Sequence, residues 1–452
     1  MNSVATLVDF ALDARYEALP DAARHSARMF LADAVSVGIS GSSEDSARGV
    51  REAATSWGSG DAATILGTSR RLPASSAAFV NSFQVHCQEY DPLHEAATVH
   101  AMAVLTGALL ATAETDGASG EDLLLGTAVG VEIAVLLGLA ASEGLRFFRP
   151  ATAGALGSTL ALARLSGLDR ERTKNALGLA YSQLAGTMQA HVEGSVALPV
   201  QIAHASRAAV TAVDLARSGL DGPHDVLDGP FGYFTLYERD GSLDGLADSL
   251  GAPWRITELS HKPFPTGRAA HAMLDAMRVL KRQHDFDIDD IDTIIVTVPP
   301  LIHRLVARPL RADMSVNDAR LCLAYLLACL LRTDDIDSSS FDRGALDDSG
   351  NHALGERLRF EIDESHGTDV LSPQSMQVRL RDGSVLSHDV PHTPGSPENA
   401  LSEDERAQKF ARCVAAAGLD PAPLSAALDG LPDSVSAREM LTLASSASPH
   451  RR

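Results

Sequence analysis

Apolar residues recur at helical spacing through about the first 260 positions of the chain. In "PDAARHSARMFLADAVSVGISGSS", Asp21 is placed to cap a helix that ends in a Gly/Ser turn. The segment "GEDLLLGTAVGVEIAVLLGLAA", from Gly120 to Ala141, is apolar on nearly every face, which predicts a central, fully buried helix. The N-terminal segment is typical of an amphipathic helix and not of a signal peptide. We therefore expect a large helical domain that begins with residues 1–262.

The pattern changes after "HKPFPTG", which spans residues 261–267. The run "IDDIDTIIVTVPP" predicts a strand, because it is rich in β-branched residues and ends at paired prolines. "SMQVRLRDGSVLSHDVPH" predicts a hairpin around its Asp-Gly turn, and "SVNDARLCLAYLLACLLRT" between them predicts a helix. We expect a smaller α+β lid domain over residues 263–395. Residues 396–445 are helical again and are expected to return to the first domain, and residues 446–452 resemble a disordered tail.

Composition narrows the class of protein. The chain has 452 residues, of which 45% are hydrophobic and 5% aromatic, which favours a mainly α protein with two domains. The net charge of −21 argues against nucleic acid and anionic membranes as partners, and every long apolar run has polar interruptions. The four cysteines lack the spacing of a thiolate metal cluster. We expect a cytoplasmic protein that binds neither nucleic acid nor membrane.

The stretch "NSFQVHCQEYDPLHEAATVH", residues 81–100, concentrates histidines and carboxylates. A proline ends its first helix, so Asp91 and His94 fall in a loop, and His100 opens the next helix. The positive end of a helix dipole disfavours a protonated histidine, which suits His100 to general base catalysis. Glu89 or Asp91 would orient its ring.

Two other interpretations of this stretch remain open. Histidine and carboxylate side chains are good ligands for zinc or iron, although the spacing H-x2-E-x-D-x2-H-x5-H fits no metal motif with a known mechanism. The same groups could also satisfy one another around a tight loop. We favour a proton-transfer site that uses no metal or other cofactor, in which His86 and Glu95 have structural roles.

Lys262 lies in "SHKPFPTGRAAH", at the expected junction between the two domains. Pro263 and Pro265 favour an extended chain, so the lysine is expected to project where ligands often bind. It is a candidate anchor for a substrate carboxylate, with Arg268 and His271 as supports. A surface lysine at a turn is the simpler interpretation of Lys262 taken alone.

Tyr325 lies in the apolar segment "LCLAYLLACLL". A phenol in a buried helix needs a hydrogen-bond partner, and it could serve as a proton donor. A tyrosine of the hydrophobic core is the simpler interpretation.

These segments together resemble the MmgE/PrpD family. The likeness runs in order through "HSARMFLADAVSVGISGS", "NSFQVHCQEYDPLHEAATVH", "GLAYSQLAGTM", "HKPFPTGRAAHAMLDAM" and "MSVNDARLCLAYLLACLL". The family includes dehydratases, decarboxylases and an epimerase of small carboxylic acids. The resemblance implies a helical domain built from both chain ends, an α+β lid, a homodimer, and a cofactor-free active site between the domains.

The resemblance also assigns residues. The family's acidic loop, helix-opening histidine, lysine motif and lid-helix tyrosine correspond here to Glu89, Asp91, His94, His100, Lys262 and Tyr325. Three positions depart from the family pattern: Leu198 replaces a lysine, Arg149 or Ala151 replaces a histidine, and Gly267 replaces a histidine of the decarboxylase branch. The side chains left to bind substrate are Lys262, Arg268, His271 and Arg149. They restore only part of the lost positive charge, which argues against a tricarboxylate substrate.

The sequence thus predicts a lyase, either a dehydratase or a decarboxylase, that acts on a small carboxylic acid. Lys262, helped by an arginine, would hold one carboxylate while His100 moves a proton at the adjacent carbon, because the resulting negative charge needs a nearby cation. Tyr325 or His94 would be the opposing acid. Two alternatives remain: an epimerase of a dicarboxylate-like substrate, and a catalytically degenerate dimer that binds a small acid.

Overall fold

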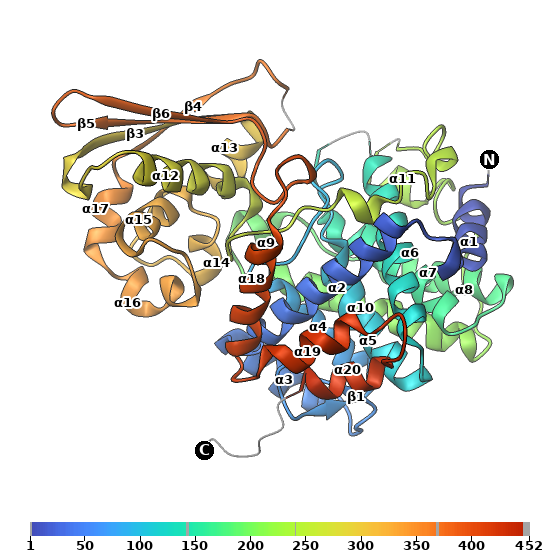
Figure 1. Ribbon diagram of the computed structural model, residues 1–452. Coiled ribbons are helices and arrows are strands. Elements are labelled where there is room, and N and C mark those ends of the chain that lie inside the picture. Colours follow the sequence, from blue (N-terminus) through green and yellow to red (C-terminus); the bar gives the residue numbers. More distant parts are fainter. Residues whose placement is uncertain (1, 142–143, 240, 368–369, 446–452) are drawn as a thin grey trace.

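The computed structural model describes residues 2–141, 144–239, 241–367 and 370–445, and the predicted tail at residues 446–452 lies outside them. The structure is mainly helical with a small mixed four-stranded sheet, which confirms the predicted fold class. Its elements form a helical part and a smaller part, each around its own hydrophobic core. In Figure 1 the helical part lies on the right, and the smaller part, with its sheet, lies on the left.

The helical part is built around α6, which packs against α5 and α7. Its helices up to the junction are α1 (Ser3–Asp13), α2 (Asp21–Gly41), α3 (Asp45–Ser56), α4 (Ala74–His86), α5 (Ala101–Asp116), α6 (Gly120–Leu139), α7 (Arg149–Leu165), α8 (Arg170–Tyr181), α9 (Gln189–Val192), α10 (Ala197–Arg217) and α11 (Tyr233–Leu236). Two short strands, β1 (Ala63–Thr64) and β2 (Arg71–Leu72), pair antiparallel beside them. A Cβ on Gly157 of α7 would lie 2.5 Å from the carbonyl oxygen of Gly130, so these glycines let α6 and α7 pack closely.

Helix α6 confirms the predicted central helix. It starts in a capping box, in which Ser119 accepts from the amide of Asp122 and the Asp122 carboxylate accepts from the amide of Ser119. By length and composition α6 could cross a membrane, but 89% of its most apolar window is buried inside the protein. Its apolar character therefore reflects packing against other helices.

The smaller part combines the four-stranded sheet with short helices. Its elements are α12 (His271–Gln283), β3 (Ile291–Val298), α13 (Pro300–Val306), α14 (Val316–Ala319), α15 (Leu323–Thr333), α16 (Arg343–Leu346), α17 (Ser349–Gly355), β4 (Leu358–Ile362), β5 (Gln374–Leu380) and β6 (Val385–Val390). The strand order is β4-β3-β5-β6, with β4 parallel to β3 and the other pairs antiparallel. The hairpin β5-β6 turns at the Asp-Gly pair, as predicted. Helix α12 packs against β5, β6 and α15.

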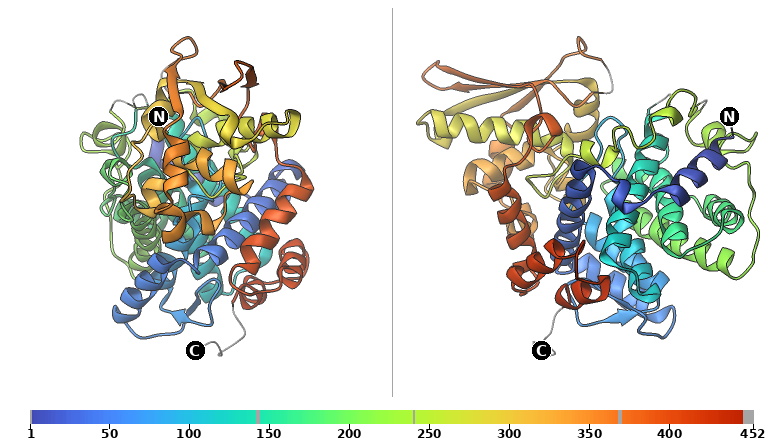
Figure 2. Two further views of the ribbon diagram at one scale, coloured as in Figure 1. Left: turned by 90° about the vertical axis from the view of Figure 1, so that its left-hand side faces the viewer. Right: turned by 45° about the vertical axis from the view of Figure 1, so that its right-hand side comes forward.

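The chain then returns to the helical part through α18 (Glu403–Ala415), α19 (Pro421–Asp429) and α20 (Ala437–Leu443). Figures 1 and 2 show these last helices, in red, beside the N-terminal blue helices, and α18 and α19 contact α2 while α20 contacts α5. The ammonium of Lys409 on α18 donates to Asp33 on α2, at 2.8 Å, and to the carbonyl oxygen of Tyr90, at 3.0 Å. The end of the chain is thus bonded to the loop that carries the candidate site.

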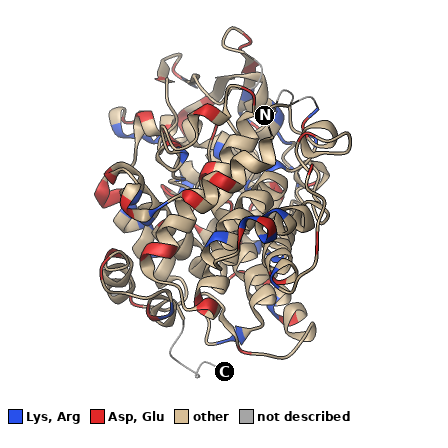
Figure 3. Cartoon of the chain, turned by 90° about the vertical axis from the view of Figure 1, so that its right-hand side faces the viewer, with Lys and Arg blue, Asp and Glu red and all other residues tan. Residues whose placement is uncertain are grey.

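Charged residues are intermingled over the face of the helical part drawn in Figure 3. Red acidic and blue basic positions are scattered over mostly tan helices there. This arrangement fits a net charge that is negative overall, at −21, but locally balanced by ion pairs.

Candidate active site

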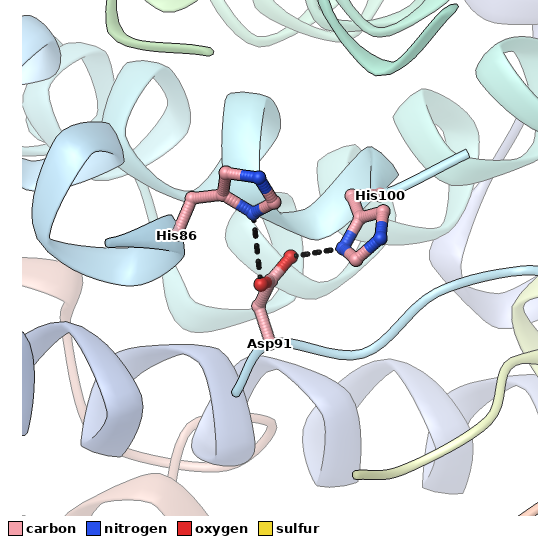
Figure 4. A group of neighbouring side chains, drawn as sticks. All are labelled: His86, Asp91 and His100. Carbon is pink, nitrogen blue, oxygen red and sulfur yellow. Dashed lines mark hydrogen bonds and ion pairs between the residues drawn. The ribbon is translucent and has the colours of Figure 1, made fainter. Parts of the chain in front are cut away.

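One buried carboxylate holds two histidines at the end of α4 and the start of α5. Helix α4 ends at His86, the chain turns through Asp91, and His100 is the N-cap residue of α5. Nδ1 of His86 lies 3.0 Å from one oxygen of Asp91, and Nδ1 of His100 lies 2.7 Å from the other, as Figure 4 shows. Because an ionised carboxylate can only accept, both imidazoles donate through Nδ1–H. Asp91 therefore fixes the orientation and the tautomer of both rings.

The two histidines have opposite proton preferences. Burial raises the pKa of Asp91, but His100 and His86 outweigh it and hold that pKa well below its usual range. Burial lowers the pKa of His86, but Asp91 and Glu89 outweigh it, so the pKa of His86 is raised. For His100 burial prevails over Asp91, and Lys262 adds to it, so its pKa is lowered. At neutral pH His100 is thus the better base and His86 the better acid.

Glu89 forms the second ion pair of the site, with Lys262. The Lys262 ammonium donates to the Glu89 carboxylate at 2.9 Å and to the Glu89 carbonyl oxygen at 3.0 Å. Burial raises the pKa of Glu89, but Lys262 and then His86 outweigh it and lower that pKa to about 2. Lys262 is 0% exposed, so it does not project from the junction as the sequence predicted. The two neighbouring prolines indicated that the backbone is extended here. The sequence does not reveal that Lys262 pairs with the carboxylate of Glu89, which lies 173 positions away in the chain.

A pocket lies in front of these groups, where the helical and smaller parts meet. About 710 Å³ of space between atoms lies there, and this figure includes open solvent. Its polar lining consists of His86, Glu89, Glu95, Thr98, His100, His191 and Arg268. Its apolar lining consists of Leu93, Leu145, Phe148, Pro150, Met188 and Leu198 from the helical part, and Ala269, Leu301, Leu305, Val306, Leu321 and Leu371 from the smaller part.

Arg268 lines this pocket but is fully occupied by the protein itself. Its Nε and one terminal nitrogen donate to Glu95, at 2.9 and 2.6 Å. Its remaining N–H groups donate to the carbonyl oxygens of His261, Thr393 and Pro394. The role of Arg268 as a substrate ligand stays a prediction, and in the structure every donor of its guanidinium already has an acceptor.

Four other predicted residues are placed away from the pocket. His271 is buried, and one of its ring nitrogens lies 3.2 Å from the carbonyl oxygen of Thr266. His94 contacts Glu258 at 3.2 Å and accepts from the amide of Ala97. These contacts give His271 and His94 structural partners in place of the predicted contacts with substrate.

Arg149 and Tyr325 are the other two predicted site residues that are placed away from the pocket. Arg149 forms a buried bidentate pair with Glu238, with both contacts at 3.0 Å. The Tyr325 hydroxyl donates to the carbonyl oxygen of Ser340 inside the core of the smaller part, and burial raises its pKa. Tyr325 is thus a core tyrosine, the simpler of the two interpretations that its sequence position allowed.

Sequence reasoning missed two residues of the pocket, His86 and His191. His86 stood within the singled-out stretch, but its sequence position does not reveal that it shares Asp91 with His100. His191 stands in "GTMQAHVEGS", which carries no motif, and folding brings it to Arg308. Arg308 donates to Nδ1 of His191 at 3.3 Å, and burial together with Arg308 lowers the pKa of His191 to about 4. His191 is therefore neutral, with its proton on Nε2.

His86, Asp91 and His100 could also hold a metal ion, since one ligand atom from each lies within 4.8 Å of the others. In the structure, however, both oxygens of Asp91 accept hydrogen bonds from the two Nδ1 atoms. An ion bound at these nitrogens would have to displace both protons. These three side chains can transfer protons in the positions that the structure shows. They could bind a metal ion only after the Nδ1 atoms of both histidines had lost their protons.

Three features define the class of protein. Both chain ends contribute to the helical part, the smaller part contains a mixed sheet, and the pocket between the two parts is lined by titratable side chains. Models of the MmgE/PrpD N-terminal and C-terminal domains match residues 5–245 and 264–420. The chain belongs to the MmgE/PrpD family, which confirms the family predicted from its motifs.

Individual relatives are more distant. The chain is 25% identical over 435 residues to a cis-aconitate decarboxylase-like protein of Aspergillus oryzae, covering 90% of each chain. It is 27% identical over 405 residues to the cis-aconitate decarboxylase of Mus musculus, covering 86% of this chain and 81% of the relative. It is also 27% identical over 356 residues to the enzyme of that name from Homo sapiens, covering 75% of this chain and 72% of the relative.

Proposed function

We propose that the protein is a lyase that acts on a small carboxylic acid and that His100 carries out the central proton transfer. Membership of the MmgE/PrpD family and relatives named as cis-aconitate decarboxylases support the class of reaction. The observation that carries the proposal is the geometry of His100. Its Nδ1 is held by Asp91, and its Nε2 has no hydrogen-bond partner among the residues that the structure describes. This is the arrangement of an oriented general base.

The site offers the parts that such a reaction needs. His100 would take a proton from the carbon next to the substrate carboxylate, through the lone pair of Nε2. Negative charge would then develop on the carboxylate oxygens, where the Nε2–H group of His191, which lines the same pocket, would stabilise it. Lys262, behind Glu89, adds positive potential but does not touch the substrate. No step of this scheme requires a cofactor.

Two outcomes of the proton transfer define the candidate activities. Loss of water or of carbon dioxide would make the protein a dehydratase or a decarboxylase, and we place it in this lyase class. Epimerisation is the second candidate. Epimerisation is favoured because two histidines that can carry a proton, His86 and His100, both bond to Asp91, and the centroids of their rings are only 4.9 Å apart.

The test is solvent deuterium exchange and conversion of a panel of small acids, followed by NMR, in the parent and in His100→Gln. We expect exchange or conversion in the parent and a loss of roughly 10²-fold or more in the variant. His366→Gln is the matched control, because His366 is an exposed histidine that also faces an aspartate, Asp363. Equal rates in the parent and in His100→Gln would contradict the proposal.

Product analysis and metal removal separate the alternatives. Epimerisation leaves the mass of the acid unchanged apart from deuterium, whereas a lyase releases water or carbon dioxide. Treatment with a chelator should leave the rate unchanged. Loss of activity that zinc or iron restores would instead assign His86, Asp91 and His100 to a metal site.

A further inference from the structure

We propose that the pocket selects an acid with a single carboxylate and an apolar carbon chain over di- and tricarboxylic acids. This inference rests on the proposed function, because it names the substrate class of the same site. It is carried by three observations: the cations at the pocket are already neutralised, one neutral donor remains, and the walls are apolar.

The first observation concerns charge. Apart from its histidines, the charged lining of the pocket is Glu89, Glu95 and Arg268. Arg268 is bonded to Glu95 at 2.6 Å and to three backbone carbonyls, and Lys262 is bonded to Glu89. A substrate with several carboxylates would thus meet two carboxylates of the protein and no uncommitted guanidinium among the lining residues. Each charge that left water without a partner would weaken binding.

The second observation is the donor that remains. A guanidinium contains only donor groups, so Nδ1 of His191 must accept from Arg308. The proton of the neutral His191 ring is therefore on Nε2. Nε2 of His191 has no hydrogen-bond partner within the described part of the chain, and His191 lines the pocket. The buried Nε2 of His86 has no hydrogen-bond partner but lies 3.6 Å from a carboxylate oxygen of Glu89, so it faces the protein's own carboxylate. The Nε2–H of His191 is therefore the donor that remains for one carboxylate of a ligand.

The third observation concerns the walls. Phe148, Met188 and Leu198 line one side of the pocket, and Leu301 and Leu321 line the other. Such surfaces favour methylene groups and penalise a second carboxylate.

The space beside Gly267 is also filled by an apolar group. A Cβ on Gly267 would lie 2.5 Å from Cδ2 of Leu321, so Leu321 occupies the place that a side chain at position 267 would need. The smaller part therefore presents the apolar side chain of Leu321 at this place.

Calorimetric titration of the whole protein tests the inference with hexanoate, adipate and propane-1,2,3-tricarboxylate. Hexanoate and adipate have chains of equal length and differ in the second carboxylate. We expect hexanoate to bind roughly tenfold or more tightly than either of the others. Equal or tighter binding of adipate, or no binding of hexanoate, would overturn the inference.

Charge variants sharpen the result. Leu198→Lys places a cation on the apolar wall and should shift the preference towards adipate by roughly tenfold. Leu198→Met keeps the wall apolar and should retain the order of the parent. Leu215→Lys adds the same charge on the exposed face of α10 and should also leave the order unchanged. If Leu198→Lys does not fold, the comparison of hexanoate with adipate in the parent still decides the question.

Failure of this inference is distinguishable from failure of the proposed function, because binding requires no turnover. A preference for hexanoate with equal exchange rates in the parent and in His100→Gln would overturn the proposed function alone. Tighter binding of adipate with exchange that depends on His100 would overturn the substrate class alone.

Discussion

The helical part and the smaller part contribute different kinds of side chain to the pocket. The helical part supplies the titratable groups, because His86, Asp91 and His100 come from the loop between α4 and α5. The smaller part supplies mainly apolar side chains from α13 and from the segments around it, together with Arg268, whose donors are all occupied. The helical part therefore holds the titratable groups while both parts supply apolar walls, so substitutions in the two parts should have different effects on turnover.

Asp91→Asn is expected to have the largest effect. The introduced amide would donate to one imidazole, which would force that ring to carry its proton on Nε2 and so remove a base or an acid. We expect turnover to fall roughly 10²- to 10⁴-fold. Circular dichroism would check that the variant folds, and Asp363→Asn, at the exposed pair with His366, is the control. Turnover within a few-fold of the parent would show that the shared carboxylate is dispensable.

Glu89→Gln should act mainly on stability, because it leaves Lys262 buried without its carboxylate. We expect the free energy of unfolding at pH 7 to fall by about 3 kcal/mol, measured by denaturant titration. The pKa of Glu89 is lowered from 4.5 to about 2, so its stabilisation is present above pH 4.5 and is lost as the pH falls through about 2. The difference between parent and variant should therefore shrink on acidification.

The pair itself can be tested with a double variant. Adding Lys262→Met to Glu89→Gln removes the unpaired ammonium and should recover part of the lost stability. If the single variant at Glu89 unfolds with the same free energy as the parent at pH 7, the ion pair contributes nothing.

Tyr325→Phe should have the smallest effect. The hydroxyl bonds to Ser340 inside the core of the smaller part, so its loss should cost about 1 kcal/mol of stability and leave turnover almost unchanged. Thermal unfolding and steady-state kinetics measure the two quantities. A large drop in turnover without loss of structure would make Tyr325 catalytic and would remove the contrast between the two parts.

The features predicted correctly from the sequence depend on local patterns. The buried helix α6 follows from its apolar run, and the hairpin β5-β6 follows from its Asp-Gly turn. These signals lie within a few residues of the elements that they specify. The family, too, could be predicted, because its motifs occur in order along the chain.

The features that the sequence could not supply depend on distant partners. Lys262 and Arg268 were expected to be available to a ligand, but each is bonded to a carboxylate 173 positions away. The role of His86 depends on which way its ring points at the end of α4, and that of His191 depends on Arg308 from the smaller part. Residue type and spacing predicted where titratable groups gather, whereas the pairing among them required the fold.

The most direct test is a pH titration of the imidazole nitrogens of His86 and His100 by ¹⁵N NMR, with assignments from single Gln variants. Since the pKa of His100 is lowered from 6.5 and that of His86 is raised from it, His100 should be mostly neutral at pH 6.5, with its proton on Nδ1. His86 should be mostly protonated on both nitrogens at the same pH. A protonated His100, a proton on its Nε2 in the neutral form, or a neutral His86 would contradict the account.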